Sequence, residues 1–240
     1  MNFVFDIDGT ICFDGKTIEE SILEALYELS LHGHEVIFAS ARPIRDLVPV
    51  LPTSFHKGRL VGGNGCFVSD NEKITSSYFL PELRETLHTI IQQHQLTYLA
   101  DSEWDYAFTG NMDHPIYKNI NHHTAKNYPI LELQKVCKLV LFKPTTTVIE
   151  QLQNLPVSIT HYKSESAIDI SPIGINKVSG LEKLGIEDFI AFGNDSNDQC
   201  MFEKARYSIC VGDNDVHQYA SKQISKNDVA KTILQLKNEF

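Results

Sequence analysis

Apolar and polar positions follow a clear order in the first part of the chain. Residues 3–5 form an apolar run of strand type, residues 18–31 place apolar side chains at helical spacing, and residues 35–39 form a second apolar run. A third short run covers residues 59–61. A strand, a helix and a strand in this order predict a parallel βαβ unit.

The pattern changes from Pro81 onward. Helical spacing begins there, strand-type residues follow at 97–108 and 136–142, and a second helix is expected over residues 146–154, with a strand at 157–162. This stretch contains no phosphate-binding loop. It predicts an inserted α+β module rather than a continuation of the βαβ pattern.

The earlier pattern returns near the end of this stretch. Strands are predicted at 167–171, 189–192 and 207–211, the last of these being the final core strand, and Lys177 begins a helix that ends at Gly185. Lysine in the first turn of a helix opposes the helix dipole, so an acidic or phosphate partner is expected close to Lys177.

These elements predict an α/β fold with a three-layer, doubly wound (Rossmann-like) parallel-sheet core and an inserted α+β domain. The expected core covers residues 1–80 and 167–240, and the expected insertion covers residues 81–166. In parallel sheets of this kind, ligands bind at the carboxyl ends of the strands, which directs attention to the residues that follow each strand.

Composition limits the classes of partner. The formal net charge is -10, which argues against a surface for nucleic acid or anionic membranes, and 42% of the residues are hydrophobic, enough for a packed core. No apolar run approaches the length of about 18 residues that a membrane span requires. The five cysteines are scattered and include no C-x-x-C pair. We expect a cytoplasmic protein, monomeric or a weak homodimer.

Two carboxylates end the first strand. In extended chain Asp6 and Asp8 point to the same side, with Ile7 turned away. Two such charges at about 4 Å repel by roughly 4 kcal/mol at an effective dielectric constant near 20. A fold keeps both only if a cation lies between them or one of them is protonated.

Other polar residues follow the later strands. Ser40-Ala41-Arg42 comes after the second strand, where a hydroxyl and backbone N–H groups could donate to an anion, although serine before a helix is often only a cap. Asn64 follows the third strand in an N-G pair, which is equally typical of a turn. Residues 193–198, with the sequence G-N-D-S-N-D, follow the strand at 189–192.

Four motifs in this order resemble those of the haloacid-dehalogenase-like (HAD) hydrolases, and of their Cof-type subfamily in particular. They are D-x-D-G-T from Asp6, S-A-R from Ser40, the run that leads to Lys177, and the loop at 193–198. The resemblance spans residues 6–198. It implies that the inserted domain is a cap that selects the substrate.

The resemblance implies a phosphomonoester phosphatase that acts through an aspartyl phosphate on a small phosphorylated metabolite, such as a sugar phosphate. Asp6 would be the nucleophile and Asp8 the general acid and base, with Lys177 completing the catalytic set. Residues expected to bind the phosphate or the substrate are Ser40, Ala41, Arg42, Asn64, Lys177 and Asn197.

The resemblance also implies a Mg²⁺ cofactor, bound by Asp6, Asp8 and Asn194, with Asp195 and Asp198 supporting them from behind. This sequence departs from the family pattern, which has a carboxylate where Asn194 stands. An amide oxygen can bind Mg²⁺ but brings no charge. The sequence leaves open whether Asn194 or Asp195 binds the metal.

Two alternatives remain at this point. A phosphotransferase or phosphomutase of the same superfamily would share the aspartyl phosphate, and a phospho-aspartate receiver module would combine similar residues on a similar sheet. The place of the acidic pair after the first strand and the long insertion both disfavour the receiver module.

Overall fold

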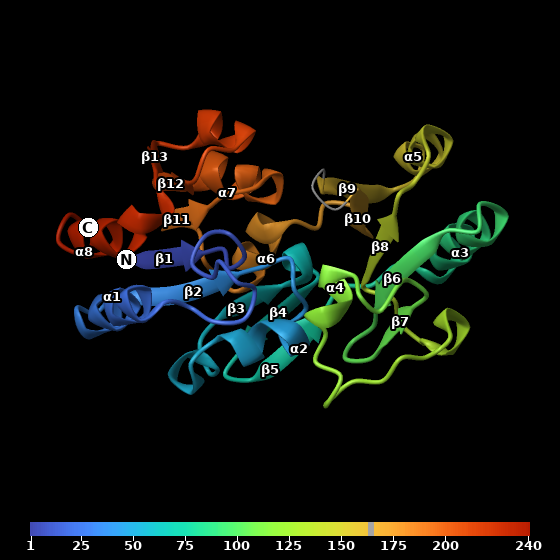
Figure 1. The fold of residues 1–240 in the computed structure, drawn as a ribbon, viewed down its shortest axis with the longest axis horizontal. Helices are drawn as coiled ribbons and strands as arrows, with labels where there is room; N and C mark the ends of the chain where they lie inside the picture. Colours follow the sequence, from blue (N-terminus) through green and yellow to red (C-terminus); the bar gives the residue numbers. More distant parts are fainter. Residues whose placement is uncertain (163–165) are drawn as a thin grey trace. The chain divides into compact units, whose positions relative to one another are not determined.

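The computed structural model describes residues 1–162 and 166–240, and the chain divides into two compact units (Figure 1). Unit 1 consists of Met1–Thr75 and Lys177–Phe240, and unit 2 consists of Ser76–Asn176. Unit 2 therefore interrupts unit 1 in the sequence.

Unit 1 is built on a sheet of eight strands in the order β13-β12-β11-β1-β2-β3-β4-β5. From β13 to β3 neighbouring strands run parallel, and β4 pairs antiparallel with β3. The strand order reverses direction at β1, and this switch point is where doubly wound sheets bind their ligands. The strands are β1 (Asn2–Phe5), β2 (Glu35–Ala39), β3 (Leu60–Gly62), β4 (Phe67–Asp70), β5 (Lys73–Ser76), β11 (Phe189–Gly193), β12 (Tyr207–Val211) and β13 (Lys222–Ile224).

Strand β1 is buried on both faces, as a central parallel strand must be. Phe5 stacks on Phe192 of the neighbouring strand, with ring centroids 4.8 Å apart. Val4 points to the opposite face, where it joins a cluster with Ile37 and Ala191. Side chains on both faces therefore fix the end of β1 in place.

Helices cover the two faces of this sheet. On the Val4 face, α6 and α7 contribute Leu181 and Met201 to the core. On the Phe3 face, the ring of Phe3 meets His34, whose Nε2 bonds the backbone oxygen of Lys237 at the end of α8, and α8 in turn packs against α1. Three layers result, as the sequence predicts. The helices of unit 1 are α1 (Glu20–Leu31), α2 (Ile44–Leu47), α6 (Lys177–Lys183), α7 (Gln199–Lys204) and α8 (Val229–Leu236).

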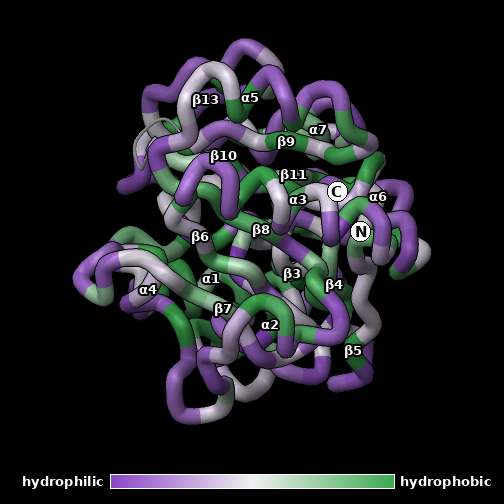
Figure 2. The backbone as a smooth tube through the Cα atoms, turned by 90° about the vertical axis from the view of Figure 1, so that its right-hand side faces the viewer, coloured by the Kyte–Doolittle hydropathy of each residue, from purple (hydrophilic) through white to green (hydrophobic). Residues whose placement is uncertain are grey.

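Unit 2 has a sheet of five strands in the order β7-β6-β8-β10-β9, and neighbouring strands pair antiparallel. One face packs under α3 and α5, and the other packs against residues that include Ile116 and Ile120. Hydrophobic residues concentrate along central strands such as β8 here and β11 in unit 1 (Figure 2). The elements are α3 (Pro81–Gln93), β6 (Thr97–Asp101), β7 (Tyr106–Phe108), α4 (Pro115–Lys118), β8 (Lys138–Phe142), α5 (Thr146–Gln153), β9 (Val157–Tyr162) and β10 (Ala167–Pro172).

Three details differ from the sequence-based expectation. Unit 2 begins at Ser76, before the expected start of the insertion at residue 81. The strand that begins at Ala167 pairs with β8 and β9, so it belongs to unit 2, and unit 1 resumes only at Lys177. The predicted boundary at residues 166/167 is therefore too early. In addition, β12 is not the last core strand, because β13 pairs with it. The three residues of β13 include an exposed Lys222 and Gln223, and such a short polar edge strand has no periodic signal.

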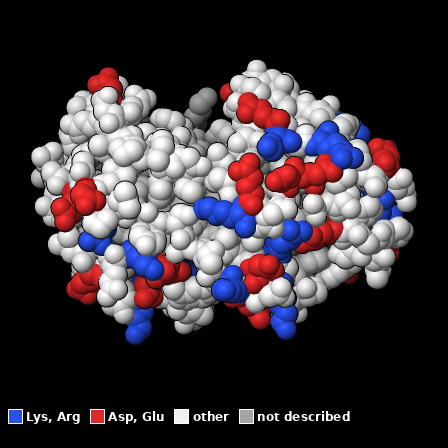
Figure 3. All heavy atoms as spheres, turned by 180° about the vertical axis from the view of Figure 1, so that it is seen from behind, with Lys and Arg blue, Asp and Glu red and all other residues white. Residues whose placement is uncertain are grey.

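Charged side chains are interspersed rather than segregated on the face shown in Figure 3. Among the described residues, none of the helices has both the length and the apolar character needed to cross a bilayer.

Candidate active site

Asp6 lies directly after β1, at the switch point of the sheet. The residue is only 5% exposed, and its backbone N–H donates to the backbone oxygen of Phe192 at 2.9 Å. Its Oδ1 accepts a hydrogen bond from Lys177 Nζ at 2.6 Å, and its Oδ2 accepts one from Thr10 Oγ1 at 3.0 Å. Both carboxylate oxygens are therefore held in fixed directions by buried donors.

Lys177 and Asp198 form the base of the site, and both side chains are fully buried. Lys177 Nζ lies 2.6 Å from Asp198 Oδ1, so the acidic partner expected from its position in the first helical turn is present. The other oxygen of Asp198 accepts the backbone N–H groups of Asn194 and Asp195, at 2.8 and 3.0 Å. A Cβ at Gly193 would lie 2.5 Å from the Asp198 carboxyl carbon, which explains glycine there.

Burial and neighbouring charge set the protonation of this cluster. Burial is the main cause that raises the pKa of the Asp6 carboxyl to about 7; Lys177 acts to lower this pKa, and the charges of Asp198 and Asp8 act to raise it. For Lys177, burial acts to lower the pKa, but the charges of Asp198 and Asp6 outweigh it and raise the pKa. Lys177 is therefore an ammonium group at neutral pH. Ionisation of Asp6 is unfavourable at this buried position unless a further cation stabilises the carboxylate.

Asp8 is held by an arginine clamp. Arg42 donates from Nε to Asp8 Oδ2 at 2.8 Å and from Nη2 to Asp8 Oδ1 at 2.6 Å, a bidentate pair. Arg42 Nη2 also donates to the backbone oxygen of Gly15 at 2.7 Å. The guanidinium is buried, whereas the Asp8 side chain is 44% exposed. This carboxylate is thus oriented yet open to solvent.

The residues that follow β2, β3 and β11 join the same network. The Ser40 hydroxyl accepts the backbone N–H of Arg42 at 3.1 Å, and the Ser40 backbone oxygen accepts the N–H of Asn64 at 3.0 Å. Asn197 Nδ2 donates to Asn64 Oδ1 at 3.0 Å. Asn64 itself has a left-handed backbone, with φ of 54°. The structure therefore brings the residues predicted after separate strands to one edge of the sheet, with Ala41 between two of them.

The position of Asn194 bears on the metal. The inward atom of its amide lies 3.0 Å from the Asp8 backbone oxygen, 3.2 Å from Asp6 Oδ2 and 3.0 Å from Thr10 Oγ1. The neighbouring Asp195 is exposed, and its carboxylate accepts the backbone N–H of Ser196 at 2.6 Å. Of these two residues, Asn194 is the one whose side chain meets the oxygens of the acidic pair.

The oxygens around Asn194 fit a small divalent cation. When the Asn194 amide points its oxygen into the site, this oxygen faces Asp6 Oδ2 and the Asp8 backbone oxygen. Octahedral Mg²⁺ with ligands at about 2.1 Å has adjacent oxygens about 3 Å apart, as here. Asp6, the Asp8 backbone and Asn194 are therefore residues that could hold Mg²⁺.

Thr10 ends the D-x-D-G-T motif, but the sequence alone assigns it no role at the site. Its hydroxyl is fully buried and lies between Asp6 Oδ2 and the Asn194 amide. The preceding Gly9 has φ of +81°, and a Cβ there would lie 2.2 Å from the Asn194 amide. The signal that could have indicated this role is the place of Thr10 in that motif, two residues after a paired carboxylate.

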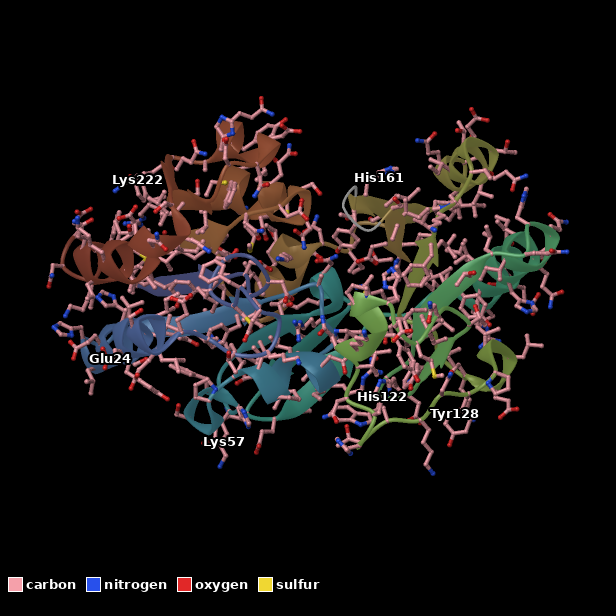
Figure 4. The ribbon with its side chains drawn as sticks, in the orientation of Figure 1. Glu24, Lys57, His122, Tyr128, His161 and Lys222 are labelled. Atoms are coloured by element: carbon pink, nitrogen blue, oxygen red, sulfur yellow. The ribbon has the colours of Figure 1, made fainter. Side chains whose placement is uncertain are left out.

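The histidines of unit 2 do not form a second metal site. Both ring nitrogens of His122 (Figure 4) are engaged, Nδ1 with Tyr106 Oη at 2.9 Å and Nε2 with the Tyr117 backbone oxygen at 3.1 Å. Within the described part of the chain, no group of three or more His, Cys, Asp or Glu side chains could hold a metal ion. The candidate site at Asp6 does not count as such a group, because its other two candidate ligands are the Asp8 backbone oxygen and the Asn194 amide.

Known proteins resemble the chain over nearly its whole length. The family model for haloacid dehalogenase-like hydrolases matches residues 3–235. The HMP-PP phosphatase of Yersinia pseudotuberculosis is 26% identical and covers 87% of this chain and 82% of its own.

Solved structures share the fold at low sequence identity. The HAD subclass IIB sugar phosphatase BT4131 superposes with a TM-score of 0.77 at 19% identity, over 98% of each chain. A haloacid dehalogenase-like hydrolase from B. subtilis superposes with a TM-score of 0.83 at 15% identity, over 98% of this chain and 99% of its own. The family resemblance predicted from the four motifs is confirmed: the chain belongs to the haloacid dehalogenase-like hydrolase family.

Proposed function

We propose that this chain is a Mg²⁺-dependent phosphatase that hydrolyses a phosphomonoester of a small metabolite, such as a sugar phosphate, through a phosphorylated Asp6. The observation that best supports it is the buried Asp6 carboxylate at the strand switch point, with Lys177 at 2.6 Å. The names of a relative, an HMP-PP phosphatase, and of a structural neighbour, a sugar phosphatase, support the substrate class.

Asp6 is suited to be the nucleophile. Lys177 holds Oδ1 and Thr10 holds Oδ2, so the carboxylate cannot rotate away from an incoming phosphoryl group. Attack forms a bond between a carboxylate oxygen and phosphorus and breaks the ester bond to the leaving oxygen. The Lys177 ammonium offsets part of the repulsion between Asp6 and the phosphate dianion.

Asp8 is suited to proton transfer at the leaving oxygen. It would donate a proton to the departing alkoxide and then accept one from the water that hydrolyses the aspartyl phosphate. The Arg42 clamp supports a positioning role for this arginine in addition to the substrate-binding role predicted from the sequence. Binding of the phosphoryl oxygens by Ser40, Ala41, Asn64 and Asn197 remains a prediction.

Mg²⁺ would be held by Asp6, the Asp8 backbone oxygen and Asn194. Asp198 would keep the loop in place by accepting the backbone N–H of Asn194. The ion would supply positive charge that polarises the phosphoryl oxygens. Selection of the substrate by the inserted unit, which the sequence predicts, also remains a prediction.

Phosphate release from a panel of phosphomonoesters, with and without Mg²⁺, tests the proposal. Asp6→Asn should abolish release, by at least about 10⁴-fold, because the amide cannot attack phosphorus. Asp113→Asn makes the same change at an exposed position of unit 2 and should leave release unaltered. Release by Asp6→Asn at the wild-type rate would place the nucleophile elsewhere.

The same experiment separates the alternatives. A phosphomutase conserves total phosphoester while the phosphate changes position, whereas a phosphatase liberates inorganic phosphate. A receiver-type module would keep its phospho-aspartate for long periods after phosphorylation. Rapid turnover with stoichiometric phosphate release therefore excludes both.

A further inference from the structure

We propose that Asn194 makes the cation site of this chain deficient in negative charge, so that a divalent ion binds tightly only together with the phosphoryl anion of the substrate. The inference rests on the cation site of the proposed function, but not on turnover. It concerns the order and mutual dependence of cation and substrate binding.

The charges around the site support this inference. Asp6 is the only one of the three candidate ligands that brings a charge, because Asp8 offers a backbone oxygen and Asn194 an amide. The carboxylate of Asp8 is paired with Arg42 in a bidentate contact, which neutralises it.

Lys177 reduces the negative charge further. Its ammonium group contacts both Asp6 and Asp198 at 2.6 Å, so these two carboxylates and one ammonium together have a single negative charge. Asp195 does not compensate, since it is exposed and its carboxylate caps the turn at Ser196. A divalent ion bound here without an anion would leave a net positive charge at a buried site. Affinity for such ions decreases as the number of negatively charged ligands decreases.

The Asn194 amide adds a second cost to binding the ion alone. With its nitrogen inward, the amide donates to Thr10 Oγ1, to Asp6 Oδ2 and to the Asp8 backbone oxygen. These hydrogen bonds occupy the oxygens that a cation needs. Binding the ion therefore requires the amide to turn its oxygen inward and give up the bonds to Asp6 and Asp8.

A phosphoryl dianion removes the charge deficit and offsets the cost of turning the Asn194 amide. It supplies two negative charges and further oxygen ligands at the same edge of the sheet, where the acidic pair meets Lys177. The cation and the anion should therefore each raise the affinity of the other by the same factor, since coupling between two binding sites is reciprocal.

Binding of Mn²⁺ alone, followed by electron paramagnetic resonance, tests this inference without turnover. We expect wild-type protein to bind Mn²⁺ at least tenfold more tightly in the presence of methylphosphonate, an anion with three phosphoryl-type oxygens and no ester bond to hydrolyse. Asn194→Asp should bind Mn²⁺ alone at least tenfold more tightly than wild type, and its gain from methylphosphonate should be smaller. Isothermal calorimetry of methylphosphonate with and without Mn²⁺ gives the reciprocal measurement.

Two further variants serve as controls. Asn194→Ser keeps the position neutral and should not bind Mn²⁺ more tightly than wild type, while Asn238→Asp adds the same charge at an exposed position near the C-terminus and should leave Mn²⁺ affinity unchanged. Thermal unfolding checks the fold of each variant. Metal-free Asn194→Asp should melt lower than wild type and gain more from Mn²⁺, because it places a second carboxylate beside Asp6.

The inference is wrong if wild type and Asn194→Asp bind Mn²⁺ alone with equal affinity, or if methylphosphonate does not change the Mn²⁺ affinity of wild type. Failure of the proposed function has a different signature. In that case the coupling between Mn²⁺ and methylphosphonate would be present, but no phosphomonoester would be hydrolysed.

Discussion

Each unit of this protein contains a buried lysine in an ion pair. The two lysines differ in which strands and which kind of sheet supply their carboxylate partners. Lys177 in unit 1 meets Asp6 and Asp198, side chains that follow β1 and β11 at the carboxyl edge of a parallel sheet. Lys138 in unit 2 meets Asp169 Oδ2 at 3.0 Å within an antiparallel sheet, and Asp169 also accepts a hydrogen bond from Tyr162.

The difference shows that a buried ion pair does not by itself indicate a catalytic site. Lys138 lies on β8 directly across from Asp101 of β6, so the register of one sheet brings these charges together. The residues around Lys177 come from three distant parts of the sequence and meet where ligands bind in such folds. We interpret the Lys138 cluster as structural and the Lys177 cluster as catalytic. Substitutions in each cluster test this distinction.

Among the substitutions that test this distinction, Lys177→Met should have the largest effect, which is a loss of activity. Loss of the ammonium leaves Asp6 and Asp198 as neighbouring buried carboxylates and removes the charge that faces the phosphate, so phosphate release should fall by at least about 10³-fold. Stability should fall as well, which thermal unfolding would measure. Activity within tenfold of wild type in folded Lys177→Met protein would show that the two lysines have similar roles.

The matched change in unit 2 is Lys138→Met. It leaves Asp169 buried without this cation, so the free energy of unfolding should fall by about 3–5 kcal/mol, measured by denaturant titration. Phosphate release per folded molecule should stay within about tenfold of wild type. A loss as large as that of Lys177→Met would mean that the unit 2 cluster also takes part in the chemistry.

Asp8→Asn should lower phosphate release by roughly 10²-fold or more, the scale of a lost general acid and base. The amide keeps the size of the side chain and the backbone oxygen that faces Asn194, but it leaves the Arg42 guanidinium without its carboxylate partner, so Mn²⁺ binding should weaken as well. Substrates with acidic leaving groups, which need no protonation, should lose less. Equal losses for all leaving groups would contradict the proton-transfer role.

The smallest expected effect is on the pH dependence of stability in metal-free protein. Burial raises the folded-state pKa of Asp6 to about 7, so Asp6 contributes stability below its unfolded pKa near 4 that is lost as pH rises through 7. Asp6→Asn removes this dependence, so its melting temperature relative to wild type should increase by several degrees between pH 5 and pH 8. A constant difference would show that Asp6 ionises as easily in the folded as in the unfolded protein.

Local patterns predicted most of the fold and the edge of the sheet where the candidate site lies. The buried strand before Asp6 and the helical spacing after Lys177 are signals within a few residues, and the structure has β1 and α6 at these places. The rule that ligands bind at the carboxyl ends of parallel strands then predicted which edge of the sheet to examine. Residues 6, 40 and 177 could therefore be grouped before their contacts were known.

Other features depend on contacts between distant residues, which no local pattern encodes. The strand at Ala167 has the same apolar character in either unit, and only its pairing with β8 and β9 places it in unit 2. The Arg42 clamp on Asp8 and the buried position of the Thr10 hydroxyl likewise result from three-dimensional packing. The choice between Asn194 and Asp195 depended on which side chain the loop turns inward.

The central claim is that Asp6 attacks the phosphorus atom. Rapid acid quenching during turnover with Mg²⁺, followed by mass spectrometry of the peptides, tests it most directly. We predict a phosphoryl group on Asp6 that forms and decays at rates compatible with phosphate release and is absent from Asp6→Asn. A phosphoryl group on another residue, or turnover by Asp6→Asn at the wild-type rate, would contradict the account.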